Sequence, residues 1–168
     1  MGVGTNILGY GDKNVNKAVL DTVKKGNMST LNCPEEVELT EKLLKIHKWA
    51  GIAKYARSGG EINAVAIRIA RAFSKKQKIA ICGYHGWHDW YLAANLASSD
   101  SLNQHLLDNL PISGVPKELD NTIVPFKFND FADLDYLSGL NDLAAIKMEV
   151  MRSVPPNPGY LERIRSIC

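Results

Sequence analysis

The sequence has few cysteines, no strong charge of either sign and no long apolar run. Its three cysteines, Cys33, Cys82 and Cys168, are odd in number and widely spaced, which favours reduced thiols over a disulfide framework. The net charge is +2 with both signs interspersed, so no footprint for nucleic acid or an anionic membrane is present. No apolar run approaches a membrane span, and the first residues lack a secretory leader. We therefore expect a cytoplasmic protein that binds neither nucleic acid nor membrane.

The two common glycine-rich nucleotide motifs are also missing. Neither the dinucleotide fingerprint G-x-G-x-x-G nor the P-loop G-x-x-x-x-G-K-[ST] occurs. Ser58-Gly59-Gly60 nevertheless stands between a predicted strand and a strongly periodic helix. Free N–H groups and the helix dipole at such a position favour an anion, phosphate above all. A plain strand-to-helix turn would give the same pattern, and Arg57 beside it is either an anion contact or an exposed charge.

The order of the predicted elements indicates an α/β protein. Apolar runs predict strands at 52–58, 78–83, 122–128 and 143–150. Caps and helical periodicity predict helices beginning near residues 13, 34, 59, 88, 129 and 160. Strands that alternate with helices indicate a mostly parallel sheet with flanking helices, and Pro125 places its strand at an edge or at a bend. We expect residues 1–50 to form an N-terminal helical segment and 51–168 to form the sheet domain.

The stretch CGYHGWHDW, residues 82–90, follows a predicted buried strand, where ligand loops of α/β sheets lie. An aromatic ring there, such as Tyr84, can stack on a planar ligand. His85, His88 and Asp89 have the side-chain types of a metal site, which leaves a small metal hydrolase as one alternative. Aromatic packing with surface histidines is the other. Without a distant third ligand type, the metal reading is the weakest of the three.

Glu149 stands at the end of an otherwise apolar predicted strand. A carboxylate in that position is either a site residue or one half of a salt bridge, with Arg152 as the nearest partner in sequence. The sequence alone favours the salt bridge.

Taken together, these stretches resemble the class III aminotransferases, a family of pyridoxal-phosphate enzymes, and most closely the branch that includes the glutamate-1-semialdehyde aminomutases. ARSGGEINAVAIRIARA, residues 56–72, resembles the family's S-G-x-E segment, and GYHGWHDW, residues 83–90, resembles its Tyr-His-Gly loop. Residues 144–168 resemble its glutamate strand and following helix, and residues 4–19 resemble the segment before its first helix. The resemblance covers nearly the whole chain.

This resemblance implies the large domain of a fold-type I transferase and pyridoxal 5′-phosphate as cofactor. It implies phosphate contacts from Ser58, Gly59 and Gly60. Tyr84 would stack on the pyridine ring beside His85, and Glu149 would lie on the substrate side of the active-site floor. The resemblance implies no metal. Ile62 stands where the family usually has alanine, which adds bulk next to the phosphate turn.

The resemblance also implies that the chain is part of a longer enzyme. None of its lysines matches the catalytic lysine of the family, which we expect downstream, and the sequence stops inside a predicted helix. The complete enzyme would be a homodimer that moves an amino group between small amino and carbonyl compounds, or within one molecule. We expect the chain alone to be inactive. The alternative is a non-catalytic module that keeps a phosphate-binding turn or an assembly role.

Overall fold

The computed structural model describes residues 2, 4–26, 30–105, 107–151 and 153–168. The chain divides into two compact units, Met1–Lys54 and Tyr55–Cys168, and each is described by itself. How these units correspond to the expected segments 1–50 and 51–168 of a complete enzyme stays a prediction. None of the helices in the described ranges is long and apolar enough to cross a membrane.

The first unit holds two helices, and the first of them has the predicted bounds. Helix α1 spans Lys13–Lys25, and the carboxylate of Asp12 accepts hydrogen bonds from the N–H groups of Asn14 and Val15, both at 3.0 Å. Gly26 ends the helix with a φ of +107°. Such caps satisfy N–H and C=O groups that the helix cannot bond internally, which is why they mark its ends.

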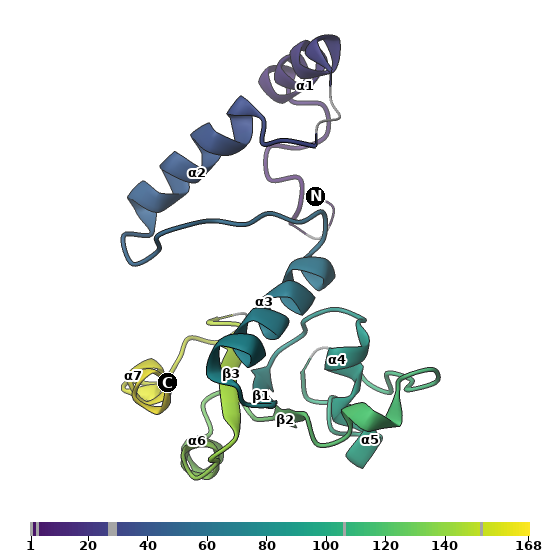
Figure 1. Ribbon diagram of the computed structural model, residues 1–168, viewed down its shortest axis with the longest axis vertical. Helices are drawn as coiled ribbons and strands as arrows, with labels where there is room; N and C mark the ends of the chain where they lie inside the picture. The colour runs from purple at the N-terminus through teal and green to yellow at the C-terminus, as the bar shows by residue number, and fades with distance from the viewer. Residues whose placement is uncertain (1, 3, 27–29, 106, 152) are drawn as a thin grey trace. The chain divides into compact units, whose positions relative to one another are not determined.

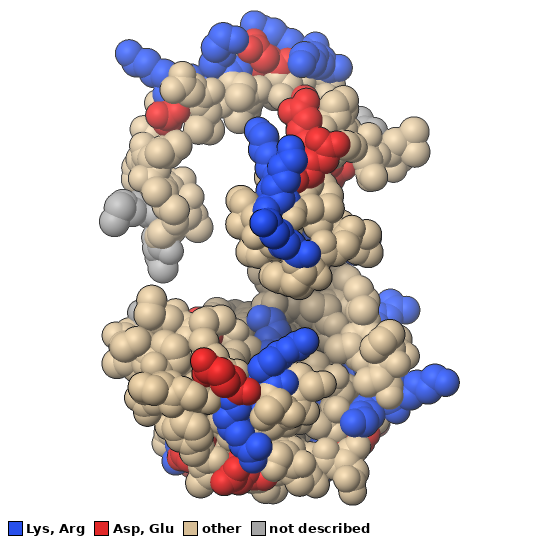
Figure 2. Space-filling model, turned by 90° about the vertical axis from the view of Figure 1, so that its left-hand side faces the viewer, with Lys and Arg blue, Asp and Glu red and all other residues tan. Residues whose placement is uncertain are grey.

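Helix α2 spans Pro34–Ile46, as predicted to within one residue. Proline is favoured at a first helical position, and the Glu36 carboxylate accepts the N–H of Cys33 at 3.3 Å. No residue of α1 or α2 is buried. Figure 2 shows basic and acidic side chains next to one another on the visible face, and Lys17 and Asp21 of α1 pair at 2.6 Å.

The second unit is built on a three-stranded parallel sheet, which confirms the predicted fold class (Figure 1). Strand β1, Lys78–Cys82, lies in the centre, with β2, Ile123–Pro125, on one side and β3, Leu143–Met148, on the other. Four consecutive residues of β1 are buried, as expected for the central strand of a sheet covered on both faces.

Pro125 confirms the predicted edge position of its strand, because β2 pairs only with β1 in the described part of the chain. The pairing also shows which way the proline faces. Ile79 donates its N–H to the carbonyl of Thr122 at 3.0 Å, and Phe126 donates to the carbonyl of Ile81 at 2.9 Å. Backbone N–H and C=O groups point alternately to the two sides of a strand. The backbone nitrogen of Pro125 therefore points away from β1, and its missing N–H costs the sheet no hydrogen bond.

Helices cover both faces of the sheet (Figure 1). Helix α3, Gly59–Ser74, and the short helices α4, Asp89–Leu92, and α5, Ala94–Ala97, pack with Ile79 and Ile81 on one face. Helices α6, Phe131–Ser138, and α7, Tyr160–Ile167, pack with Ala80 and Cys82 on the other. A single 3₁₀ turn, Lys117–Leu119, interrupts the long connection before β2. Successive side chains of β1 point to opposite faces of the sheet, so the apolar side chains form two cores, one on each face.

The predicted strand at 52–58 is wrong. These residues are irregular and exposed, and no strand of the described chain pairs with them. A strand is stable only when its N–H and C=O groups meet a neighbouring strand, so an apolar pattern without such a neighbour does not suffice. The predicted helix from residue 88 is also divided, into α4 and α5, at Ala93.

Candidate functional site

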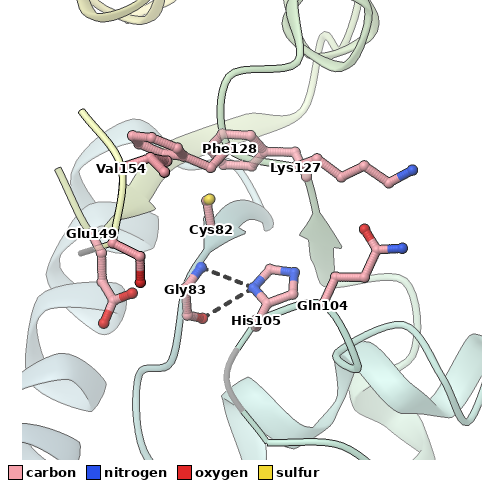
Figure 3. A pocket seen from close by; sticks show the side chains of 10 residues that line it. Cys82, Gly83, Gln104, His105, Lys127, Phe128, Glu149 and Val154 are labelled. Atoms are coloured by element: carbon pink, nitrogen blue, oxygen red, sulfur yellow. Dashed lines mark hydrogen bonds between the residues drawn. The ribbon is translucent and has the colours of Figure 1, made fainter. Parts of the chain in front are cut away.

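The candidate site lies at the carboxyl ends of the three strands. The chain leaves β1 towards α4 on one face of the sheet and leaves β2 towards α6 on the other. Connections that diverge in this way open a crevice, which is where open α/β sheets bind ligands. A pocket of about 350 Å³ lies there, and Gly83, His105 and Glu149 are among the residues that line it (Figure 3).

The first component of the site is the N-terminus of α3. Ser58 caps this helix, and its hydroxyl oxygen accepts the N–H of Glu61 at 3.2 Å. The Glu61 carboxylate in turn accepts the N–H of Arg57 at 2.9 Å. The N–H groups of Gly59 and Gly60 belong to the first turn, whose donors an α-helix cannot bond internally. The sixteen-residue helix thus presents two glycine N–H groups at its positive end.

The second component is the loop Gly83–His88, which lies directly against that helix start. A Cβ atom on Gly86 would stand 3.1 Å from the Cα atom of Gly60, and one on Gly60 would stand 2.5 Å from the His88 ring. The Asn63 amide, one turn into α3, donates to the carbonyl of His85 at 3.1 Å. The paired glycines therefore let two segments more than twenty residues apart approach closely.

His85 is held inside this loop and is only 5% exposed. Its Nε2 lies 3.0 Å from the carbonyl oxygen of Cys82, and its Nδ1 lies 3.3 Å from Nζ of Lys147. Burial, followed by the charge of Lys147, lowers the pKa of His85 to about 4. The neutral ring therefore donates from Nε2 and accepts at Nδ1. Burial also lowers the pKa of Lys147, while Glu149 acts in the opposite direction.

Gly83 is the first residue of the loop and also lines the pocket. Its N–H lies 2.9 Å from Nδ1 of His105, and its carbonyl accepts the hydroxyl of Tyr91 at 3.1 Å. Glu149 follows β3 and packs against Gly83, where a Cβ would stand 2.6 Å from a carboxylate oxygen. Figure 3 shows Glu149 and His105 on opposite sides of Gly83, both facing the pocket.

Tyr84 is half-buried next to these groups. Its ring meets Tyr91 edge to face, with 5.8 Å between centroids. Tyr91 and Trp90 of α4 also pack on His85, with centroids 5.9 Å and 6.5 Å from its ring. Trp90 and Tyr91 are therefore buried supports of the loop, whereas Tyr84 is partly exposed and Trp87 is 56% exposed.

The structure brings the predicted site residues together around the end of β1. Gly60, at the start of α3, meets Gly86 and His88 of the loop. Glu149 packs against Gly83, where the same loop begins. In the described ranges no group of three His, Cys, Asp or Glu side chains is placed to hold a metal ion. The salt bridge expected between Glu149 and Arg152 involves a residue outside the described ones.

The sequence prediction missed three residues that shape the site: Asn63, His105 and Lys147. Only Lys147 carried a signal, as the one charged residue within the apolar run LAAIKM. The other two act through contacts more than twenty residues apart in the chain, which no local pattern reveals.

Comparison with known proteins now identifies the class. The chain matches no protein-family model. It is 31% identical to glutamate-1-semialdehyde 2,1-aminomutase of Sulfolobus acidocaldarius and 30% identical to 3-aminobutyryl-CoA aminotransferase of Cloacimonas acidaminovorans. The matches take in 99% and 98% of this chain but only 40% and 38% of those proteins. The chain thus spans about two fifths of the length of these relatives.

The fold of this chain is also similar to that of solved structures. A transaminase with pyridoxal phosphate bound superposes with a TM-score of 0.71 at 24% identity, over 94% of this chain and 38% of the other. Taurine:2-oxoglutarate aminotransferase from Bifidobacterium kashiwanohense superposes with a TM-score of 0.68 at 20% identity, over 96% of this chain and 41% of the other.

The fold is that of part of a fold-type I pyridoxal-phosphate-dependent transferase. In sequence, the chain is similar to a glutamate-1-semialdehyde 2,1-aminomutase and to an aminotransferase over part of their length. The resemblance inferred from the motifs is thereby confirmed.

Proposed function

We propose that this chain supplies the phosphate and ring contacts for pyridoxal 5′-phosphate in an aminotransferase or aminomutase. The complete enzyme would move an amino group between small amino and carbonyl compounds. One observation carries the proposal, namely the close approach of Gly60 and Gly86, which joins the α3 N-terminus to the aromatic loop. That contact supports the proposal, because it joins a helix N-terminus to the loop that carries the half-buried Tyr84. A phosphate-bearing planar cofactor needs an anion site and an aromatic ring of this kind.

The residues present fit this cofactor in their chemistry. The hydroxyl of Ser58 and the N–H groups of Gly59 and Gly60 are donors for a phosphate, and a Cβ on Gly59 would meet open space. Tyr84 would stack on the pyridine ring, with His85 holding the loop beneath it. The Glu149 carboxylate would face the substrate side of the floor. When bound, the cofactor would supply an electron sink for cleavage of a bond at the carbon that carries the substrate's amino group.

Several properties of the complete protein follow as proposals from its relatives. The substrate would be a small amino compound, and the enzyme would be a cytoplasmic homodimer. The relatives named above include both an aminomutase and an aminotransferase, so both reactions fit the matched segment.

Binding of pyridoxamine 5′-phosphate tests the proposal directly. This form of the cofactor has no aldehyde, so it cannot react with surface lysines. We expect the chain to bind it at least about tenfold more tightly than pyridoxamine, because the helix N-terminus contributes only when the phosphate is present. Isothermal titration calorimetry of both compounds is the measurement. Equal affinity for the two, or no binding of either, would contradict the proposal.

Substitution of Gly86 separates the site from general folding. Gly86→Ala should weaken the binding of pyridoxamine 5′-phosphate by about tenfold or more, because its Cβ would push the loop away from Gly60. Gly114→Ala is the matched control, since Gly114 also has a positive φ, of +87°, but its Cβ would meet nothing within 4 Å. An equal loss of affinity in both variants would show that backbone strain alone is responsible, and not the contact of Gly86 with Gly60 of α3.

We further expect the chain by itself to show no sustained amino-group transfer. None of its lysines matches the family's catalytic lysine, so the proton movement at the substrate has no base in the expected position. The assay is product formation with pyridoxal 5′-phosphate and a panel of amino donors and keto acids over many equivalents of protein. Repeated turnover would refute this expectation, whereas binding without turnover also fits the alternative of a non-catalytic module.

A further inference from the structure

Lys147 occupies an unusual position for a lysine. It lies in β3 among apolar neighbours, is half-buried, and pairs in register with Ile81 of the central strand. Ala145 of the same strand packs into the core beneath α3, and side chains two residues apart share a face of a sheet. Lys147 therefore extends beneath α3, on the face that carries the candidate site, and not into solvent.

The ammonium group of Lys147 has a defined partner on that face. Nζ lies 3.3 Å from Nδ1 of His85, a ring that is almost fully buried. The other ring nitrogen lies 3.0 Å from the carbonyl of Cys82, so that nitrogen is the donor. Nδ1 must then accept, and a lysine ammonium can only donate. The two contacts are mutually consistent and fix one tautomer and one orientation of the ring.

His85 is consequently anchored to three different elements. Its ring is bound to the end of β1 through Cys82 and to β3 through Lys147, and its backbone carbonyl is bound to α3 through Asn63. Of these three anchors, Lys147 is the only charged one, and hydrogen bonds with one charged partner are the stronger kind. Tyr84 precedes His85 directly, so the anchored residue sets where the Tyr84 ring stands.

We propose that Lys147 is a positioning residue that holds His85, and through it the loop Gly83–His88, in the conformation that receives the cofactor ring. The effect of Lys147 on cofactor binding rests on the proposed function, whereas the contact between Lys147 and His85 does not. Removal of the ammonium leaves Nδ1 of His85 buried without its donor, a state that favours rearrangement of the ring and of the loop attached to it. Lys147 itself need not touch the cofactor.

The first test uses the unmodified chain without ligand. Long-range ¹⁵N–¹H correlation spectra of the histidine rings should show His85 as the Nε2–H tautomer, with Nδ1 unprotonated and shifted upfield by the hydrogen bond it accepts. In Lys147→Met, which keeps an unbranched side chain one atom shorter and removes the ammonium group, the Nδ1 resonance should move downfield. The amide resonances of the loop should shift with it. An Nδ1–H tautomer in the unmodified chain would overturn the proposal without any variant.

The second test is affinity for pyridoxamine 5′-phosphate. Lys147→Met should bind it about five- to tenfold more weakly, and Lys147→Arg, which keeps a charged donor, should recover most of the affinity. Lys78→Met is the matched control, because Lys78 lies half-buried in the same sheet and has the same charge. Circular dichroism establishes that each variant is folded.

The outcomes separate the two proposals. If the unmodified chain binds no pyridoxamine 5′-phosphate, the proposed function fails, and the ring spectra still decide the role of Lys147. An unchanged Nδ1 resonance in Lys147→Met overturns the positioning role. Equal loss of affinity in Lys147→Met and Lys78→Met also overturns it, because a general effect of charge or stability would then be responsible.

Discussion

Replacement of Gly83 by alanine is expected to destabilise the unit Tyr55–Cys168 by about 2–5 kcal/mol. Gly83 has a φ of +99°, where a residue with a Cβ is strained by about 1–2 kcal/mol. The new Cβ would also stand 2.6 Å from a carboxylate oxygen of Glu149, and overlap of this kind costs about 1–3 kcal/mol. Backbone relief is restricted, because the N–H of Gly83 is bonded to His105 and its carbonyl to Tyr91.

Urea unfolding followed by tryptophan fluorescence measures this loss. Gly114→Ala is again the suitable control, because it carries the strain of a positive φ without the contact, and should lose only the first part. The difference between the two variants then isolates the contact with Glu149. A double substitution with Glu149→Ala should recover part of the loss in Gly83→Ala. Equal losses in the two glycine variants would show that Glu149 does not pack against Gly83 in solution.

Acid should destabilise the same unit through His85. Its pKa is about 4 in the folded chain, below the usual value of 6.5, because the ring is buried and faces the charge of Lys147, with His105 acting in the same direction. Between these two pKa values the unfolded chain binds more protons than the folded chain, so the free energy of unfolding falls as the pH falls. At about 1.4 kcal/mol per pKa unit, His85 contributes a loss of about 3 kcal/mol from pH 7 to pH 4.

The measurement is the free energy of unfolding in urea at several pH values between 7 and 4. His85→Gln should be less stable at pH 7 but should lose less stability on acidification. A slope that stays the same in His85→Gln would refute the assignment, because carboxylates would then account for the acid sensitivity.

Local chemistry explains which parts of the fold were predictable. Asp12, Ser58 and Asp130 each bond the first turn of a helix that follows them, so the helix starts could be read from neighbouring residues. The strand expected at 52–58 depended on a partner strand elsewhere, and the sequence contained no information on that partner. Long periodic helices and buried strands were therefore predicted well, and an isolated apolar run was not.

The residues of the candidate site also differ in whether the local sequence reveals them. Ser58, Gly59 and Tyr84 stood in motifs whose residue types suggest a role. The contacts of Gly60 with Gly86 and of Asn63 with His85 join the two segments that carry them. The contact of Lys147 with His85 spans sixty-two residues of sequence, and that of His105 with Gly83 spans twenty-two. Such pairs arise from the register of the strands and the path of the connections, which short motifs do not encode.

Because of the orientation of Pro125, the two outer edges of this sheet differ in how well they can pair with another strand. Its missing N–H falls on the outer edge of β2, so a strand that approached from that side would find a gap in the row of donors. The outer edge of β3 spans six residues without a proline. Any additional strand, whether from the same protein or from another molecule, therefore finds a continuous template only beside β3, next to Lys147 and Glu149. Assembly onto this sheet is thus expected beside the strand that carries Lys147 and leads to Glu149.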